Sequence, residues 1–384
     1  MVVLYYTQTY FLDAAIETIR SLQEPSLELH LMIEITPDSK HSNIIHVNNL
    51  DKAAALSNLR TFLGEKKALA FEPYFKSVKS VHFLVFKRSS VLKRNTIYVL
   101  VHFLKLLYKI KPSVIHFDTI TLRSLLFIPF ITGVKKVITI HDPIPHLGDY
   151  SWKQSLTKNI YNKLAHKFVF YSKYAKSQFK QYYPYLKQPK YLIAFQPFTF
   201  NQLFEKSDLV ESCILFFGRI SYYKGIDLLM KAIPEVLKIY PHQIFVIAGR
   251  TDGYQLDYQF LKKYEHNILL LNRYINTNEA VWLIQKSKFL VCPYRDASQS
   301  GVLMTARAIG KPVIATNVGA FTEYIQDGVD GLIANPTCES LVEKILFFLN
   351  QNRYKDFEKC VEKNFSTHVA KDNQKTLLDA YSFN

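Results

Sequence analysis

Short apolar runs alternate with amphipathic stretches through the second half of the chain. Each run has four or five residues, which suits a strand buried on both faces of a parallel sheet. The expected strands are Cys213–Phe217, Ile244–Ala248, Ile268–Leu271, Phe289–Cys292, Val313–Thr316 and Gly331–Ala334. The stretches between them repeat apolar residues at helical spacing, and the expected helices are Gly225–Tyr240, Leu256–Tyr264, Thr277–Ser287, Gly301–Ile309, Ala320–Gln326 and Glu339–Asn350. This alternation predicts a doubly wound parallel sheet.

The first half alternates in the same way, with less regular spacing. Its expected strands are Val2–Tyr6, Glu28–Glu34, Val114–His116, Lys136–Ile140 and Phe168–Tyr171, and its expected helices are Ala14–Leu22 and Thr96–Ile110. The segment from Pro197 to Ser212 is interpreted as a linker, because the composition changes there from basic to neutral. We therefore expect two Rossmann-like α/β domains facing a cleft, residues 1–200 and 201–384, with the last helix of the chain a candidate to pack back on the first domain.

Charge divides the chain unequally. Residues 1–200 hold 27 Lys and Arg against 12 Asp and Glu, whereas residues 201–384 hold 21 against 20. Residues 151–200 hold nine lysines and no carboxylate. Such a half favours an anionic surface or ligand, and nucleic acid is not expected because no nucleic-acid-binding motif accompanies the charge.

Three runs in the first half mix apolar and basic residues: Phe75–Lys79, Val81–Arg88 and Phe103–Lys111. One interpretation is an amphipathic face that lies on anionic lipid, with lysines at the level of the headgroups. The other is that these runs are core elements with solvated outer faces. The sequence leaves both open.

No apolar run reaches the roughly 18 residues needed to span a bilayer. The N-terminus starts directly with a strand-like segment and has no basic region typical of a signal peptide. We therefore expect a cytoplasmic protein, with peripheral binding to the inner face of the plasma membrane as the membrane hypothesis. The four cysteines are widely spaced and are interpreted as reduced thiols without a metal site.

The segment from Phe217 to Gly225 places two glycines and two cations at the end of an apolar strand. Gly218, Arg219 and Lys224 stand before a helix whose N-terminal amides point back at the turn. Backbone amides and cations together make an anion site, so the segment predicts a place to hold phosphate. The alternative is that Arg219 and Lys224 are only solvated loop cations.

Three further segments of the second half belong to the same sequence pattern as Phe217–Gly225. They are Asn272–Ile275, Pro293–Gly301 and Gly310–Thr316. Together they resemble the retaining glycosyltransferases of group 1, family-4 type, which have the two-domain GT-B fold. The resemblance covers about residues 213–335 and is weak before residue 135. It implies that Arg219 and Lys224 hold the donor diphosphate, by a bidentate guanidinium and a point charge respectively.

The resemblance also implies a full set of donor-binding candidates. These are Gly218, Arg219, Lys224, Arg273, Ser298, Gln299, Ser300, Gly301, Thr305 and Glu323. The nucleotide-sugar is then a substrate, with no cofactor, and the absence of an Asp-x-Asp motif is consistent with a metal-independent enzyme. Glu323 has an equally good interpretation as a carboxylate placed near a helix N-terminus.

The chain departs from the family pattern at two positions. Counting back from Gly310, the two usual glutamates fall at Ala297 and Thr305. Thr305 can offer the donor ribose only a weaker, neutral hydrogen bond, and Gln299 and Ser300 are candidates to replace the missing contacts. Two hypotheses follow, a variant donor site or a site that has lost activity.

On the other side of the expected cleft, His141 and Asp142 follow the strand Lys136–Ile140. They resemble a His-Asp segment of the family whose histidine contacts the transferred sugar or its phosphate, so His141 joins Arg219 and Lys224 as a catalytic candidate. A packing role for His141 is the alternative. Ser172 and Lys173 are further candidates to line the cleft.

The resulting hypothesis is a hexosyltransferase that moves a sugar from a nucleotide-sugar donor to a lipid-linked or polysaccharide acceptor, with retention, in cell-surface glycan synthesis. Two alternatives use the same fold. One is a nucleotide-sugar epimerase or phosphorylase. The other is a catalytically silent protein that binds an anionic lipid or polymer.

Overall fold

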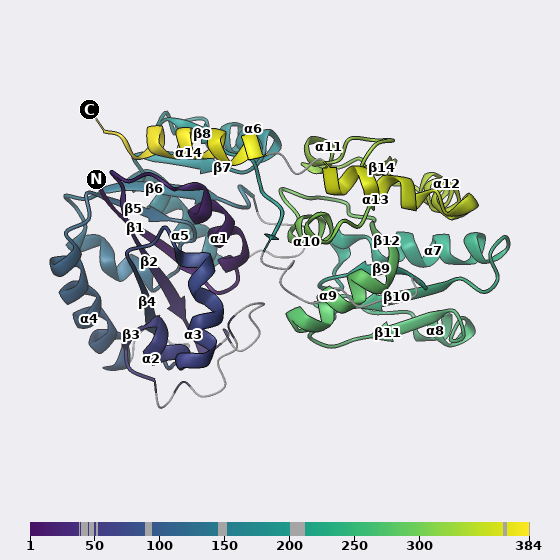
Figure 1. Ribbon diagram of the computed structural model, residues 1–384, viewed down its shortest axis with the longest axis horizontal. Helices are drawn as coiled ribbons and strands as arrows, with labels where there is room; N and C mark the ends of the chain where they lie inside the picture. Colours follow the sequence, from purple (N-terminus) through teal and green to yellow (C-terminus); the bar gives the residue numbers. More distant parts are fainter. Residues whose placement is uncertain are drawn as a thin grey trace.

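The structure is a computed structural model that describes residues 1–37, 39, 45, 50, 53–88, 94–144, 152–199, 212–363 and 367–383. Figure 1 shows two α/β domains side by side, each built around one sheet with helices on both faces. The expectation of two doubly wound α/β domains is confirmed. The predicted boundary at residues 200 and 201 lies outside the described residues, as does most of the predicted linker.

The first sheet has eight strands in the order β3-β4-β2-β1-β5-β6-β7-β8, and every neighbouring pair is parallel except β3 and β4. The strands are β1 (Val2–Gln8), β2 (Glu28–Ile35), β3 (Leu56–Asn58), β4 (Ser80–Val85), β5 (Val114–Phe117), β6 (Lys135–Ile140), β7 (Lys167–Phe170) and β8 (Lys190–Leu192). The helices are α1 (Leu12–Ser21), α2 (Leu59–Leu63), α3 (Glu65–Phe71), η2 (Glu72–Phe75), α4 (Arg94–Ile110), η3 (Ser124–Phe130), α5 (Trp152–Leu164) and α6 (Lys173–Tyr182).

One of the three mixed apolar and basic runs is a core element. Most of Val81–Arg88 is strand β4, between β2 and β3, where Phe83, Leu84 and Val85 are fully buried. In the run that begins at Phe75, that residue ends η2 and is buried. The lipid-facing interpretation is therefore wrong for β4, because its side chains already pack between the sheet and its covering helices.

The second sheet is parallel throughout, in the order β11-β10-β9-β12-β13-β14. Its strands are β9 (Cys213–Phe217), β10 (Ile244–Ala248), β11 (Ile268–Leu271), β12 (Ser287–Cys292), β13 (Val313–Thr316) and β14 (Gly331–Ala334). Its helices are η5 (Tyr222–Lys224), α7 (Ile226–Leu237), α8 (Tyr258–Lys263), α9 (Thr277–Lys286), α10 (Gly301–Ile309), α11 (Phe321–Tyr324), α12 (Cys338–Leu349), η6 (Asn350–Asn352) and α13 (Tyr354–Lys363). The strands expected from sequence are confirmed, and only the start of β12 differs, at Ser287 in place of Phe289.

The last helix, α14 (Thr367–Tyr381), lies against the first domain. Figure 1 shows it in yellow beside β7 and β8, and it also contacts α1. The Tyr381 hydroxyl is buried 2.6 Å from Nδ1 of His116 on β5. The chain therefore enters the second domain and returns to the first.

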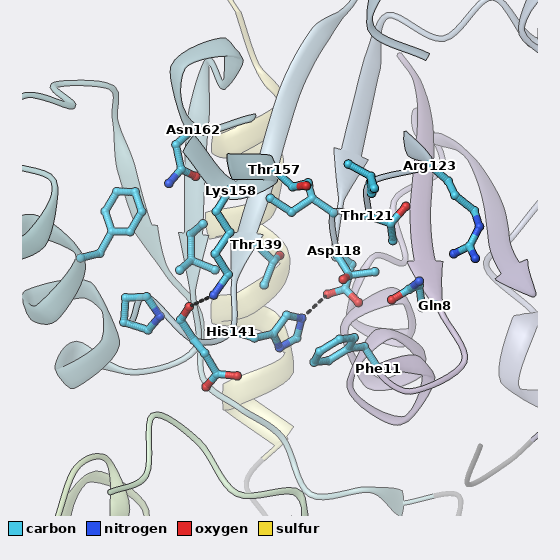
Figure 2. A pocket seen from close by; sticks show the side chains of 17 residues that line it. Gln8, Phe11, Asp118, Thr121, Arg123, Thr139, His141, Thr157, Lys158 and Asn162 are labelled. Atoms are coloured by element: carbon cyan, nitrogen blue, oxygen red, sulfur yellow. Dashed lines mark hydrogen bonds and ion pairs between the residues drawn. The ribbon is translucent and has the colours of Figure 1, made fainter. Parts of the chain in front are cut away.

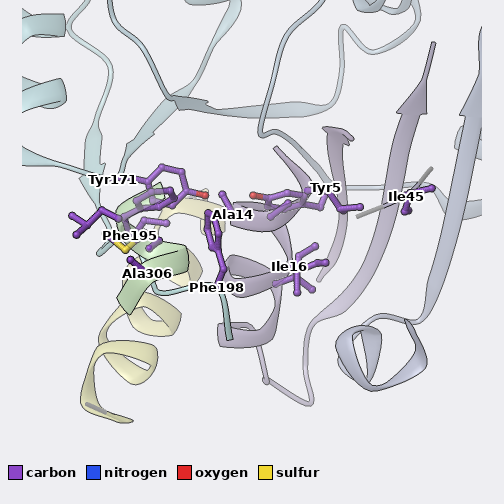
Figure 3. Packing of buried hydrophobic residues seen from close by; sticks show 14 of the residues in the cluster. Tyr5, Ala14, Ile16, Ile45, Tyr171, Phe195, Phe198 and Ala306 are labelled. Atoms are coloured by element: carbon purple, nitrogen blue, oxygen red, sulfur yellow. The ribbon is translucent and has the colours of Figure 1, made fainter. Parts of the chain in front are cut away.

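Apolar side chains join the two domains. Figure 3 shows Phe195 and Phe198 beside Tyr171 of the first domain and Ala306 of α10, within one continuous buried cluster. The Phe198 amide donates to the carbonyl oxygen of Met304 at 3.3 Å. Because burial of aromatic rings is a large favourable term in folding, this cluster holds the domains together.

The four cysteines, all within the described residues, form no disulfide bond. Burial raises the pKa of Cys213 to about 11 and that of Cys292 to about 12, so these thiols are protonated at neutral pH. Within the described ranges, none of the helices combines the length and the apolar character that crossing a bilayer demands.

Candidate functional site

The turn after β9 is built around two glycines. Gly218 has φ of +120°, and a Cβ atom at this position would lie 2.6 Å from Nζ of Lys224. Gly225 has φ of +66°, and a Cβ atom there would lie 1.8 Å from the carbonyl oxygen of Pro293. Side chains are excluded at both positions, so the turn is closely packed against the segment that follows β12.

Lys224 is the buried cation of this turn. Its ammonium group donates to the Tyr294 hydroxyl at 2.9 Å and lies 4.7 Å from the centre of that ring. Burial lowers the pKa of Lys224 to about 8. Among the described residues no carboxylate forms an ion pair with Lys224, so a bound anion would supply its counter-charge.

Lys224 lines a cavity of about 270 Å³ between the domains, here called the interdomain cavity. It is lined by Asp13, Phe198, Phe217, Gly218, Lys224, Ile275, Thr277, Ala280, Val281, Gly301, Val302 and Thr305. Three predicted donor residues besides Lys224 are thus brought together: Gly218, Gly301 and Thr305. Asp13 comes from α1 of the first domain, so both domains form the wall.

The N-terminus of α10 opens onto this cavity through Gly301. Ser300 caps the helix, accepting a hydrogen bond from the Leu303 amide at 3.3 Å. One turn later, the Thr305 hydroxyl donates to the carbonyl oxygen of Gly301 at 2.9 Å. The helix therefore presents amide groups and a hydroxyl on the side where Lys224 presents its charge, an arrangement suited to an anion.

Arg219 lies next to this group but does not line the cavity. Its guanidinium forms an exposed ion pair with Asp252 at 2.8 Å and lies 3.4 Å from the Tyr223 hydroxyl. An exposed ion pair contributes only about 0–1 kcal/mol, so exchanging Asp252 for a phosphate oxygen costs little. The predicted phosphate role of Arg219 is compatible with this position and stays a prediction.

Arg273 is not brought to the site. Both of its terminal nitrogens bind Glu279, at 2.7 and 2.5 Å, and it lines neither this cavity nor the one beside His141. Asn276 caps α9, accepting from the Glu279 amide at 3.0 Å. The Glu279 carboxylate holds Arg273, because the guanidinium offers a charged, bidentate partner.

His141 directly follows β6 and lies in a network of buried polar groups, shown in Figure 2. Its Nε2 atom is 3.2 Å from a carboxylate oxygen of Asp118, which follows β5. Asp118 also accepts from the Thr7 hydroxyl at 2.7 Å and the Tyr5 hydroxyl at 3.1 Å. Phe11 stacks on the imidazole, with 4.2 Å between ring centres.

The two buried groups control each other's protonation. Burial lowers the pKa of His141, but the charge and hydrogen bond of Asp118 outweigh it, and the pKa is raised above its usual value. Burial raises the pKa of Asp118, and the imidazolium more than compensates, so that this pKa is lowered. The pair is therefore stabilised in its charged form.

Gln299 of the second domain reaches this pair. Its Nε2 atom lies 2.7 Å from Nδ1 of His141. Sequence reasoning selected both residues for the site but not their contact, which depends on how the domains meet. If Nδ1 accepts from this amide, the imidazole is neutral and its one proton lies on Nε2, toward Asp118. In the charged form Nδ1 is also protonated and donates, and the Gln299 side chain then presents its amide oxygen to it.

A larger cavity of about 670 Å³ lies beside His141 in the first domain, here called the first-domain cavity. Figure 2 shows its lining, which comprises Gln8, Phe11, Asp118, Thr119, Ile120, Thr121, Leu122, Arg123, Thr139, Ile140, His141, Asp142, Pro143, Thr157, Lys158, Asn162 and Phe179. Lys158 donates to the backbone carbonyl of Asp142 at 2.8 Å. The cavity lies at the carboxyl ends of β5 and β6, where open α/β sheets bind ligands.

Glu323 contacts the first domain in the structure, and its predicted donor contact stays a prediction. Its two carboxylate oxygens accept from the amides of Lys173 and Tyr174, each at 2.7 Å, and so cap the N-terminus of α6 in the first domain. The carboxylate is therefore placed at a helix N-terminus, as the alternative interpretation had it, but the helix belongs to the other domain.

Ser172 and Lys173 line neither the interdomain nor the first-domain cavity. The Ser172 hydroxyl donates to the backbone carbonyl oxygen of Ser298 at 3.0 Å, and this hydrogen bond connects the two domains. These contacts place Ser172 and Ser298 at the boundary between the domains.

Sequence reasoning missed Asp118, Tyr294 and Asp13 as members of the site. Asp118 had a usable signal, because it comes two residues after the predicted strand Val114–His116, on the same sheet edge as His141. Tyr294 lies within the segment Pro293–Gly301, but its side chain is uncharged and gave no sign of a contact with a phosphate-binding lysine. Asp13 enters only through the meeting of the two domains.

Residues 211–351 match the model of the family described as glycosyl transferases group 1. An uncharacterised glycosyltransferase of Methanocaldococcus jannaschii is 35% identical over 140 residues, which cover 35% of this chain and 38% of that protein. The lipopolysaccharide core biosynthesis mannosyltransferase LpsB of Rhizobium meliloti is 30% identical over 142 residues, 35% of this chain and 40% of that protein. The similarity thus spans well under half the length of these relatives.

Similarity of fold extends over the whole chain. The Anabaena protein HepE, solved in complex with UDP and glucose, superimposes with a TM-score of 0.66 at 13% identity, covering 99% of both chains. At this identity the likeness concerns the fold. Residues 211–351 thus carry the similarity to the group 1 glycosyl transferases, and the chain as a whole has the two-domain GT-B fold.

Proposed function

We propose that this protein is a metal-independent, retaining glycosyltransferase that moves a sugar from a nucleotide-sugar donor to a glycan or lipid-linked acceptor. The observation that carries the proposal is the buried ammonium of Lys224, packed over Gly218 and facing the N-terminus of α10 across the interdomain cavity. A diphosphate supplies the counter-charge that this ammonium needs.

The demanding step in such a transfer is departure of the nucleoside diphosphate while positive charge develops on the sugar. Lys224 and the amides at Gly301 are fixed donors aimed at the leaving group, and Arg219 reaches it by leaving Asp252. Fixed donors in a buried site stabilise developing charge without reorganisation, and loss of one typically costs about 3 kcal/mol.

Thr305 replaces the carboxylate that usually binds the donor ribose. Its hydroxyl lines the cavity and is satisfied by the carbonyl oxygen of Gly301, so it can also accept a hydrogen bond from a sugar hydroxyl. Ala297 is buried, and its carbonyl oxygen accepts from the Ala320 amide at 2.8 Å. We propose that this is a variant donor site in which Thr305 gives a weaker ribose contact.

The first-domain cavity is the proposed acceptor site, and His141 stands between it and Gln299 of the donor domain. In this position a charged imidazole contacts the transferred sugar or its phosphate, with Asp118 holding the ring. The similarity to a lipopolysaccharide core mannosyltransferase supports an acceptor used in cell-surface glycan synthesis. We also propose that the protein is cytoplasmic and binds peripherally to the inner face of the plasma membrane.

A screen of UDP- and GDP-sugars by thermal shift, followed by assay of slow donor hydrolysis, tests the proposal. A donor that binds only the native state raises the melting temperature by mass action. Lys224→Met is expected to slow donor hydrolysis on the order of a hundredfold and to weaken donor binding as well. Lys231→Met removes an exposed lysine from α7 and serves as the matched control, with unchanged donor binding.

If no UDP- or GDP-sugar binds or is hydrolysed, the transferase proposal fails and a catalytically silent protein is left. A requirement for free phosphate, or release of epimerised sugar, would instead identify a phosphorylase or an epimerase.

A further inference from the structure

Helix α4 exposes large apolar side chains that nothing in the described structure covers. Relative to full exposure, Tyr108 is 80% exposed, Ile97 66%, Tyr98 56% and Val101 43%. Its opposite side is an ordinary core face, on which Val99, Phe103 and Leu106 are buried. A helix that covers a sheet normally turns polar residues outward, so the composition of this outer face requires an explanation.

Basic residues are interleaved with these apolar ones. Arg94, Lys105 and Lys109 are exposed, and their spacing along the helix puts them on the same side as Ile97, Val101 and Tyr108. Residues 73–117 hold nine Lys and Arg and no Asp or Glu. The outer face is therefore apolar and positively charged, with no carboxylate of its own segment to offset the charge.

We propose that this α4 face, formed by Arg94, Ile97, Tyr98, Val101, Lys105, Tyr108 and Lys109, binds the surface of an anionic membrane. Apolar and tyrosine side chains of an interfacial helix enter the boundary between headgroups and acyl chains, while lysines stay at the level of lipid phosphates. Each lysine near such a surface strengthens binding by about fivefold.

Charge decides between a membrane and a second copy of this chain. A symmetric dimer through α4 would place the same patch on both sides and bring its lysines toward those of the other copy. Like charges brought together in an interface are unfavourable. An anionic lipid surface complements both the apolar and the basic residues.

The buried side of α4 packs on η3, which lies next to the proposed acceptor site. Phe103 of α4 stacks on Phe127 of η3, with 3.9 Å between ring centres, and Phe130 at the end of η3 is exposed. Just before η3, Leu122 and Arg123 line the first-domain cavity. Figure 1 shows α4 on the side of the first domain that faces away from the second domain, so the membrane would leave the donor domain free.

With α4 on the membrane, an acceptor held in the membrane could reach the first-domain cavity. This statement about the acceptor is the one that rests on the proposed function. The α4 face itself is inferred from exposure and charge, independently of catalysis.

Flotation with lipid vesicles tests the proposal on the full chain. We expect the protein to float with vesicles of phosphatidylcholine mixed with phosphatidylglycerol and to stay largely unbound with phosphatidylcholine alone. Ile97→Ser and Tyr108→Ser together are expected to weaken vesicle binding by at least about tenfold, since each removes apolar area that the lipid would bury. Lys105→Gln and Lys109→Gln are expected to weaken it about fivefold each, and added salt should act in the same direction.

Tyr258→Ser with Lys262→Gln is the matched control, because it removes an exposed tyrosine and an exposed lysine from α8 of the second domain. It should float like the wild type. All α4 substitutions are at exposed positions, and an unchanged melting temperature verifies that each variant is folded.

Wild-type protein that fails to float with anionic vesicles, or α4 variants that float as well as the control, would overturn the proposal. So would a concentration-dependent dimer that the α4 substitutions abolish. Hydrolysis of a nucleotide-sugar in solution is measured separately, so failure of the transferase proposal and failure of the α4 proposal give different results.

Discussion

At the scale of single residues, the buried charge of Lys224 destabilises the protein without its ligand and is available to bind an anion. Its pKa is lowered to about 8 by burial, from an ordinary value near 10.5. That difference corresponds to a penalty on the order of 3 kcal/mol for the charged form at neutral pH. Such penalties are typical of functional sites, where a group is held ready for a partner.

Lys224→Met should therefore stabilise the protein without its ligand. We expect the free energy of unfolding at pH 7 to rise by about 1–2 kcal/mol, because the penalty is removed while the hydrogen bond to Tyr294 is lost. Between about pH 8 and pH 10.5 the unfolded lysine binds a proton that the native one does not, so wild-type stability rises with pH and the advantage of the variant shrinks. Denaturant unfolding at pH 7 and pH 10 measures both effects. A variant less stable than wild type at pH 7 would contradict the account.

The His141–Asp118 pair gives a second prediction at this scale. In wild type, the imidazole should titrate above its ordinary value near 6.5, because Asp118 outweighs burial. In Asp118→Asn, burial prevails and the pKa should fall below that value. Asp142→Asn should move it less, since Asp142 contributes less to the shift than Asp118 does.

NMR titration of the His141 imidazole measures these values. Since the native pKa of His141 is raised and that of Asp118 is lowered, the stability that the charged pair contributes is lost as pH rises through the native pKa of His141. It is also lost as pH falls through the native pKa of Asp118. Equal effects of Asp118→Asn and Asp142→Asn would show that the buried hydrogen bond is not the cause.

At the scale of helices and strands, the donor half was predictable because its strands are buried on both faces and its turns carry glycine. Gly218, Lys224 and Gly301 could be grouped from sequence, since the carboxyl ends of parallel strands meet at one edge. The first half was harder. Ser80–Val85 is a strand inside the sheet, yet its basic flanks resemble those of a surface element, and burial cannot be read from composition.

Helix α6 shows a contact that no sequence pattern reveals. Its N-terminal amides are capped by Glu323, which lies far away in the chain. Glu323→Gln should lower the free energy of unfolding by about 1 kcal/mol, the usual cost of losing a cap. Hydrogen exchange at the amides of Lys173 and Tyr174 should become faster, because these groups lose a charged acceptor.

Asn276→Ala is the matched control, because it removes the cap of α9 within the second domain. It should speed exchange at the Glu279 amide and leave Lys173 and Tyr174 unchanged. Protection at Lys173 and Tyr174 that survives Glu323→Gln would refute the interdomain cap.

At the scale of the whole molecule, catalysis as proposed depends on contacts between the domains. His141 meets Gln299, Ser172 meets Ser298, and Phe198 packs against Gly301. The sequence predicted most of these residues as candidates but none of the pairs, because pairing follows from the relative placement of two separately folded domains. Arg273 was also selected from sequence, but it pairs with Glu279 of α9 and lines neither cavity, and its donor-binding role stays a prediction.

The most direct measurement is a crystal structure with the nucleoside diphosphate that the thermal-shift screen identifies. The account predicts a diphosphate in the interdomain cavity, with its oxygens within hydrogen-bond distance of Lys224 Nζ and the amides at Gly301, and with Thr305 beside the ribose. A diphosphate bound elsewhere, with the interdomain cavity empty, would contradict the central claim.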